Sequence, residues 1–250
     1  DKRAPNGSGS LVIGARDGGG ATYLGMVDDI AVWNEVLDSS QIAELAAGQS
    51  PINAASQGNT GQDPNDQVPS FLQYTVNGDS VTITGCDTSA TGELVIPANI
   101  EGKPVTKIGF EAFKESSLTS ISIPSSVTDI SERAFYKSTS LTSISIPEGV
   151  TTIKKDTFFE CTSLTSITIP NNVTIIGDWA FYKCTSLTSV TIPDSVTSIG
   201  DGAFFNCSGI TSIIFSGNAP EIGNDVFTNI DNDTKVTVSA NSQGYGETFG

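Results

Sequence analysis

The sequence is poor in the residues that carry most enzyme chemistry. It contains no histidine in 250 residues, which excludes Ser-His-Asp and Cys-His catalytic groups, histidine-bound zinc and histidine pH switches within this chain. Glycoside hydrolysis would need two carboxyl groups across a cleft, and no paired-acid strand motif such as E-x-D-x-x-E is present. We therefore expect no catalytic residue, no metal site and no cofactor, and we interpret the chain as a protein that is not an enzyme.

Four cysteines are the remaining reactive side chains. Cys161, Cys184 and Cys207 are 23 residues apart, whereas Cys86 lies outside this spacing. Neighbouring positions of a stacked repeat come within disulfide range, but the same spacing fits a column of small, buried thiols that pack a corner. We predict buried, reduced thiols. A linear column offers poor geometry for zinc, which needs about four converging ligands.

The spacing of these cysteines belongs to a 23-residue phrase that repeats nearly unchanged along the chain. The same period separates equivalent apolar and proline positions, namely Phe135, Phe158, Phe181, Phe204 and Phe227, Leu118, Leu141, Leu164, Leu187 and Ile210, and Pro124, Pro147, Pro170 and Pro193. A fixed period of 20 to 30 residues is the signature of a solenoid with one supersecondary unit per repeat. The sequence therefore predicts coils that bury their apolar faces only by stacking on one another.

Each repeat predicts the same series of local structures. Apolar residues alternate with Ser and Thr between Leu141 and Ile146, which is typical of a half-buried strand. Pro147 ends that strand because proline has no N–H for a sheet ladder. A second short extended run, such as 196–199, is closed by Gly200 and its equivalents, where we expect a positive φ. The segment 203–207 is too short for a full helix and is interpreted as a helical turn.

The two ends of the repeat region differ from its middle. Alternating residues on either side of Asn77-Gly78 predict a β-hairpin over residues 71–84 that caps the first coil. A last strand is expected at 235–238. The predicted fold is mainly β: a solenoid of about six 23-residue coils with a parallel sheet and an N-terminal hairpin cap, spanning residues 70–250.

The repeated phrase LTSIxIPxxVTxIGxxAFxxC resembles the BspA-like leucine-rich repeats of bacterial and protozoan surface proteins. It occurs at residues 118–138, 141–161, 164–184 and 187–207, and the resemblance covers about residues 71–250. The resemblance implies a leucine-rich repeat fold, a secreted or surface-exposed bacterial protein, and a role in adhesion or protein contact rather than catalysis. A fold by itself does not determine a function.

Two columns of equivalent residues are candidate binding surfaces. The first is a hydroxyl column on the strand face, which consists of Thr119, Ser122, Thr142, Ser145, Thr165, Thr168, Thr188 and Thr191. The second is an aromatic column, which consists of Tyr136, Phe159, Tyr182 and Phe205. Each column has a simpler interpretation: the hydroxyls give a well-solvated strand face, and the rings cover the core on the back of the coil.

Residues 1–48 lack the repeat and resemble a different family. The phrase IGARDGGGATYLGMVDDIAVWNEVLDSSQIAELAAG, at residues 13–48, resembles the C-terminal end of a laminin-G-like, concanavalin-A-like jelly-roll domain. We therefore expect a partial β-sandwich here, followed by a flexible linker over residues 49–69, which is rich in Gly, Pro, Asn, Gln and Ser. Asp28-Asp29 is interpreted as a strand-to-loop hydrogen-bonding pair rather than a metal site.

Composition narrows the class of partner. The formal net charge is −16, which makes nucleic acid and anionic membrane surfaces poor partners, and no apolar run is long enough to insert into a membrane. Calcium stays open as a partner of the acidic surface, although no motif supports it. We expect an extracellular or cell-surface binding protein whose ligand is a protein or a glycan on a surface or matrix. The alternatives are a pair of carbohydrate-binding modules and an accessory region of a larger secreted polysaccharide-acting enzyme.

Overall fold

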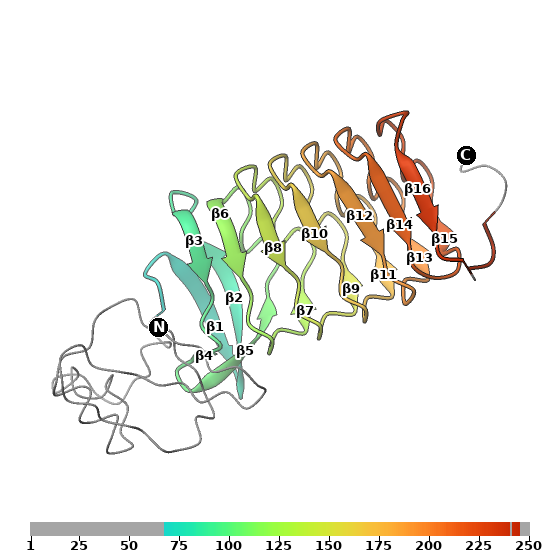
Figure 1. Ribbon diagram of the computed structural model, residues 1–250. Helices are drawn as coiled ribbons and strands as arrows, with labels where there is room; N and C mark the ends of the chain where they lie inside the picture. Colours follow the sequence, from blue (N-terminus) through green and yellow to red (C-terminus); the bar gives the residue numbers. More distant parts are fainter. Residues whose placement is uncertain (1–67, 241, 246–250) are drawn as a thin grey trace, which may run out of the picture. The chain divides into compact units, whose positions relative to one another are not determined.

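Parallel strands stacked coil on coil build the described part of the chain (Figure 1). The computed structural model describes residues 68–240 and 242–245. The long strand of successive coils recurs as β3 (Thr91–Val95), β6 (Ser117–Ser122), β8 (Ser143–Ser145), β10 (Ser166–Thr168), β12 (Ser189–Ile192), β14 (Ser212–Phe215) and β16 (Lys235–Val238). These seven strands are one more than the sequence-based estimate of about six coils. The jelly-roll fragment and Asp28-Asp29 lie outside the described residues.

A second, narrower row of strands runs along the other side of each coil. It consists of β5 (Lys103–Ile108), β7 (Asp129–Ile130), β9 (Thr152–Ile153), β11 (Ile175–Ile176), β13 (Ser198–Ile199) and β15 (Glu221–Ile222). The register advances by one repeat at each step: Ile153 pairs with Ile176, and Ile176 pairs with Ile199. The prediction of a second short extended run in each coil is confirmed.

The N-terminal end of the solenoid is covered by the predicted hairpin. Strand β1 (Leu72–Asn77) pairs antiparallel with β2 (Ser80–Cys86), and β2 then pairs parallel with β5. The turn at Asn77-Gly78 has a positive φ at Gly78, as a tight hairpin requires. A further two-residue strand, β4 (Asn99–Ile100), folds back and pairs antiparallel with β5.

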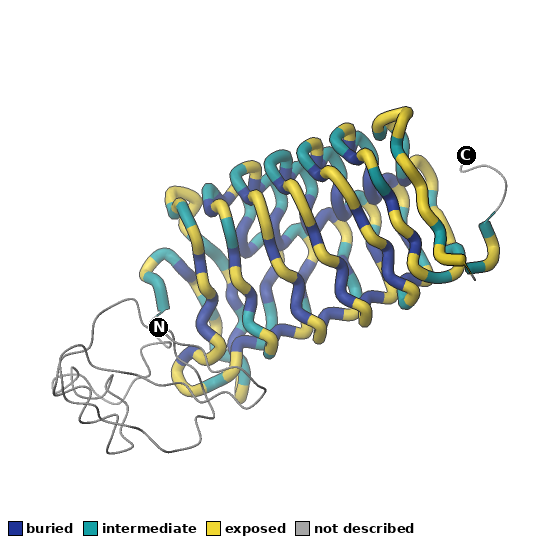
Figure 2. Tube along the Cα trace, in the orientation of Figure 1, coloured by how far each residue is buried: buried dark blue, intermediate teal, exposed yellow. Residues whose placement is uncertain are grey.

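The core is the stack of equivalent apolar residues inside the coils (Figure 2). Leu, Ile and Phe positions of successive coils are almost fully buried, with Leu141, Leu164 and Phe181 at 0% exposure. The five ring pairs from Phe113 to Phe227 are stacked at centroid distances of 5.0 to 5.5 Å, with planes within 8° of parallel. Rings that touch face to face at such distances must be laterally offset, which is the arrangement that aromatic quadrupoles favour.

The proline turns form as expected. In each regular coil the N–H of the valine three residues after the proline donates to the proline carbonyl, as from Val150 to Pro147 at 3.0 Å. The chain then reverses into the second short strand.

The segment 203–207 and its equivalents do not form a helical turn. Two residues four apart have left-handed φ angles in each coil, for example Asp156 at 57° and Glu160 at 55°. Local hydrogen bonds link residues three apart, as from Phe159 N–H to Asp156 C=O at 3.1 Å. Two consecutive tight turns therefore replace the expected single helical turn.

The prediction of a positive φ at Gly200 and its equivalents is also wrong. Gly177, Gly200 and Gly223 do not have a positive φ. At these three positions the preceding coil comes too close for a side chain: a Cβ on Gly177 would lie 2.8 Å from the Lys155 backbone nitrogen. The positive φ lies two residues later in the coil, at Gly202 and its equivalents.

The stacking predicts a large difference between core and face substitutions. Replacing Phe181 by alanine should lower the free energy of unfolding by about 3–5 kcal/mol, the range for deletion of a buried ring. Thr191→Ala, at an exposed position of the next coil with no internal hydrogen bond from its hydroxyl, should change it by less than about 0.5 kcal/mol. Urea unfolding followed by circular dichroism measures both. Equal, small losses for the two variants would contradict the assigned orientation of the coil.

Candidate binding face

The long strands present a surface made almost entirely of hydroxyl groups, which we call the hydroxyl face. All eight residues of the predicted hydroxyl column are exposed. They belong to two files: one contains Thr119, Thr142, Thr165, Thr188 and Thr211, and the other contains Ser122, Ser145, Thr168, Thr191 and Ile214. Strand pairing aligns these files, since Ser122 pairs with Ser145, Ser145 with Thr168, and Thr191 with Ile214.

The two files differ in how much hydrogen-bonding capacity they offer to a partner. Each threonine hydroxyl of the first file donates to the backbone carbonyl of the preceding coil, as from Thr142 to Thr119 at 2.9 Å and from Thr165 to Thr142 at 3.1 Å. The hydroxyls of Ser122, Ser145 and Thr168 make no hydrogen bond within the described part of the chain. The first file thus contributes chiefly to coil stacking, and the second is available for a ligand.

A third file, which sequence reasoning missed, lies between the other two. It consists of Ser120, Ser143, Ser166, Ser189 and Ser212, aligned by strand pairing through Ser120, Ser143 and Ser166 on one side and through Ser189 and Ser212 on the other. Two outward residues follow one another in each coil, because Thr and Ser precede the buried Ile or Val of the strand. The signal was present in the repeated L-T-S-I phrase, but the predicted hydroxyl column did not include its serine.

Charged residues are excluded from the middle of this face. When the three files are extended to β3 and β16, they contain only two charged side chains. Glu93 pairs with Ser120 at the β3 end, and Lys235 pairs with Ser212 at the β16 end. Val95 and Ile214 are exposed apolar residues near these ends, at 70% and 38%. The coils between them offer only uncharged, small side chains on a rigid sheet.

Charges gather instead on the back of the coils, where they pair between neighbours. Asp129 lies between Lys107 and Lys154, at 2.9 and 2.6 Å, and Glu160 lies between Lys137 and Lys183, at 3.7 and 3.3 Å. Partial burial of Asp129 raises its pKa, but the two lysines outweigh that effect and hold the pKa of Asp129 below its usual value. Within residues 68–240 and 242–245, no three acidic or cysteine side chains converge in a way that suits a metal ion.

The aromatic column is real but its ring faces are largely occupied. Tyr136, Phe159, Tyr182 and Phe205 stack on one another at 4.8, 4.5 and 5.6 Å, with planes 13 to 19° apart. Lys137 and Lys183 lie over the rings of Tyr136 and Tyr182 at 5.5 and 5.1 Å. The column is half-buried and presents ring edges and lysine chains to solvent. A sugar ring needs an open aromatic face on which to stack, so this geometry favours a structural role.

Comparison with known families and structures agrees with this architecture. The sequence profile described as the BspA type leucine rich repeat region matches six copies over residues 106–234. The chain belongs to the BspA-type leucine-rich repeat family. No curated protein sequence matches the chain.

Solved leucine-rich repeat structures share the fold. A leucine-rich repeat protein of T. pallidum is 31% identical, with a TM-score of 0.59 over 68% of this chain and 85% of that one. A leucine-rich repeat protein of Bacteroides ovatus is 27% identical, with a TM-score of 0.55 over 69% of this chain and 55% of that one. A leucine-rich cell surface protein of Faecalibacterium prausnitzii is 30% identical, with a TM-score of 0.52 over 71% and 55%. The chain therefore spans little more than half the length of the last two.

Trp179 is a feature of one coil that the neighbouring coils of this chain do not share, since Asp156 and Gly202 occupy the equivalent positions, and sequence reasoning missed it. Its ring meets Tyr182 and Phe205 edge-on, at 5.4 and 6.1 Å. It lies over Gly202, the equivalent residue of the next coil, where a Cβ would overlap the indole ring. The Trp–Gly pair at two positions 23 residues apart was the available signal.

The repeat cysteines are buried as predicted. The thiols of Cys161, Cys184 and Cys207 are fully buried, and each donates to the carbonyl of a phenylalanine in the preceding coil, at 3.1, 3.2 and 2.9 Å. Burial raises the pKa of Cys161 and Cys184 well above the usual range. All four cysteines are free. Ser138 fills the same position one coil earlier, with its hydroxyl 2.5 Å from the Phe113 carbonyl.

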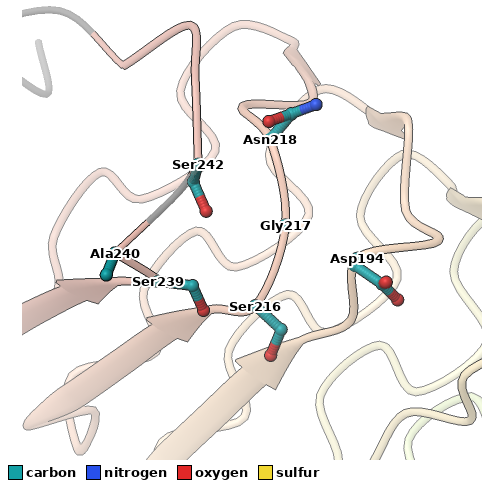
Figure 3. A pocket seen from close by; sticks show the side chains of 7 residues that line it. All are labelled: Asp194, Ser216, Gly217, Asn218, Ser239, Ala240 and Ser242. Atoms are coloured by element: carbon teal, nitrogen blue, oxygen red, sulfur yellow. The ribbon is translucent and has the colours of Figure 1, made fainter.

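A shallow depression lies beside the last coils of the BspA-type repeats (Figure 3). Its volume is about 420 Å³, and it is open to solvent on one side. Asp194, Asn218 and three serine hydroxyls line it, and the Asn218 side chain already accepts a hydrogen bond from the Gln243 N–H at 2.9 Å.

No segment in the described residues forms a helix with the length and apolarity needed to cross a membrane.

Thiol reactivity tests the burial of the cysteine column. At pH 8 the native protein should react with Ellman's reagent at Cys86 alone, and slowly, because partial burial and then Asp87 raise the pKa of that thiol. The other three thiols should react only when the coils unfold, since a thiolate is the attacking form and burial disfavours it. Absorbance at 412 nm gives the number of reactive thiols, in buffer for the native protein and in guanidinium for the unfolded protein. Rapid reaction of two or more thiols in the native state would contradict the assignment.

The Trp179–Gly202 contact predicts a coupled pair of substitutions. Gly202→Ala should destabilise the protein by more than about 2 kcal/mol, because the methyl group meets the indole ring and an L-residue with φ near 59° costs about 1 kcal/mol. In a Trp179→Ala background the same change should cost only the backbone strain of about 1 kcal/mol, because no ring is left for the methyl group to meet. Thermal or urea unfolding of the four proteins gives the coupling. A cost of Gly202→Ala that is the same in both backgrounds would show that the ring does not occupy this space.

Proposed function

We propose that the chain is a non-catalytic binding protein that acts outside the cell or on its surface and contacts other proteins through the hydroxyl face. The observation that carries the proposal is the contrast between this face and the rest of the solenoid. Ionised groups line the back of the coils, whereas every position of the three files from β6 to β14 is uncharged. The hydroxyls of the second file, from Ser122 to Thr191, have no hydrogen-bond partner inside the described part of the chain.

Physical chemistry favours a broad contact over a deep pocket. Each hydroxyl exchanges a hydrogen bond with water for one with a ligand, which gains only about 0.5–1.5 kcal/mol. A useful affinity therefore requires many such groups to engage together. The strands hold them rigidly, so little conformational entropy is lost when they bind. This arrangement suits a partner that lies flat across several coils.

Family membership supports a surface role. The F. prausnitzii structure that shares this fold is of a protein described as a leucine-rich cell surface protein, and the sequence resemblance implies adhesion or protein contact. A carbohydrate ligand has weaker support, because the faces of the aromatic column are covered by neighbouring rings and lysines.

A solid-phase binding screen of the complete 250-residue chain tests the function. The probes are purified surface and matrix proteins and a glycan array, with and without calcium. Protein binding should fall at least tenfold when Ser145, Thr168 and Thr191 are replaced together by lysine, since about 1.4 kcal/mol is tenfold in affinity.

The control places three lysines on the opposite side of the solenoid, at the exposed positions Thr128, Thr151 and Ile175. The control should bind like the unaltered protein. Glycan binding without protein binding would replace the proposal by the carbohydrate alternative. Equal losses in both triple variants, or no binding to any probe, would overturn the assignment of function to the hydroxyl face.

A further inference from the structure

The two charged residues of the hydroxyl face occupy opposite ends of one file. Glu93 on β3 pairs with Ser120, and Lys235 on β16 pairs with Ser212, so both continue the middle serine file. Both side chains are exposed, and neither makes an ion pair within the described residues. The face therefore has a negative end, an uncharged middle and a positive end. A surface with this pattern is complementary to its own copy turned end for end.

We propose that the hydroxyl face pairs with the hydroxyl face of a second copy of this chain, with the two solenoid axes antiparallel. This inference deepens the proposed function and rests on it, because it names the protein partner of the same face. A twofold axis that runs parallel to the strands, between the two faces and in front of β10, places Glu93 of each copy opposite Lys235 of the other. The same operation sets serine file against serine file, as an isologous interface requires.

The other way of stacking the two faces is disfavoured by charge. A twofold axis along the solenoid would place Glu93 opposite Glu93 and Lys235 opposite Lys235. Like charges directly opposed across an interface cost free energy, whereas opposite charges fix the register. The charge pattern thus selects one orientation.

The size of the face indicates a weak dimer. Seven strands about 4.8 Å apart, each contributing about five residues at about 3.3 Å, cover roughly 500 Å² per copy. The total of roughly 1,000 Å² is just below the range of about 1,200–2,000 Å² for stable complexes. Val95, which is 70% exposed, would be covered near Thr237 of the second copy. A weak contact of this kind gains strength when many copies are displayed on one surface.

Acidic residues at the edge of the face oppose the dimer and provide a further test. Glu148 and Asp194 occupy equivalent turns of the third and fifth long strands, after β8 and β12, so the twofold axis brings each close to the other residue of the second copy. Both are exposed, which limits the repulsion by solvent screening. Glu148→Lys should therefore strengthen the dimer, because each new lysine meets an aspartate.

Sedimentation equilibrium of the complete chain at low ionic strength tests the pairing. Wild type should show a monomer–dimer equilibrium. Glu93→Lys and Lys235→Glu should each weaken it about tenfold, since each change alters two symmetry-related contacts and tenfold corresponds to about 1.4 kcal/mol. An equimolar mixture of the two variants should restore dimers as heterodimers, because all four end charges then meet an opposite charge. Glu148→Lys should shift the equilibrium toward dimer.

Each contrary result has a definite meaning. A wild type that stays monomeric at millimolar concentration, or single variants that associate as well as wild type, would overturn the self-pairing. So would a mixture that stays as weak as its components. If self-association fails while the lysine variant of Ser145, Thr168 and Thr191 still loses protein binding, the proposed function stands and the partner is a different protein. If both experiments fail, the hydroxyl face is not a binding surface.

Discussion

The solenoid depends on the stacking of one coil on the next, and the phenylalanine ladder is its clearest expression. A single coil cannot enclose its own apolar side chains, so Phe158 is buried only because Phe135 and Phe181 cover its two faces, each at 5.2 Å. The hydrogen bonds between coils repeat at the same positions. Stability is therefore shared between neighbours, and the ends need special structures such as the β1–β2 hairpin.

The turns at the back of the coils add an electrostatic constraint of their own. N–H groups of Arg133, Phe135 and Lys137 donate to carbonyls of the next coil at 2.7 to 3.2 Å, and the pattern recurs in each later coil with the donor always in the earlier one. These peptide dipoles point the same way and add, as they do in a helix, with the positive end toward the C-terminal coils. Between residues 178 and 240 seven acidic residues outweigh two lysines, while eight acids and seven bases nearly balance between residues 97 and 177. The charge distribution thus complements the dipole.

How far the sequence predicts this structure depends on which force sets each feature. Burial and strand ends follow from periodicity, so the core, the proline turns, the hairpin and the buried cysteines were predictable from residue type alone. Backbone conformation at the back turns was not, because non-glycine residues such as Arg133 and Lys137 have positive φ there. Intercoil hydrogen bonds hold them in place and outweigh a cost of about 1 kcal/mol each.

The functional surface was predicted less completely, because it depends on the direction in which each side chain points rather than on residue type. Sequence spacing identified the threonine file correctly as exposed, but gave no sign that hydroxyls such as that of Thr142 already bond to the preceding coil. It also left Ser143 and Ser166 out of the predicted column, because strict alternation does not anticipate that two successive residues point outward. The aromatic column was located correctly, whereas the covering of its ring faces is visible only in three dimensions.

The middle of the hydroxyl face is uncharged because the repeat places its ionised residues at other positions of the coil. Ion pairs such as Lys107–Asp129–Lys154 link successive coils on the back, where alternating signs can meet along the axis. The same alternation on the sheet face would put long, hydrated side chains between the face and any partner. Small hydroxyl residues avoid that cost and keep the strands soluble, while Glu93 and Lys235 confine charge to the two ends. A surface built in this way can be approached closely in its middle and oriented by its ends, which is the combination that a specific but weak contact requires.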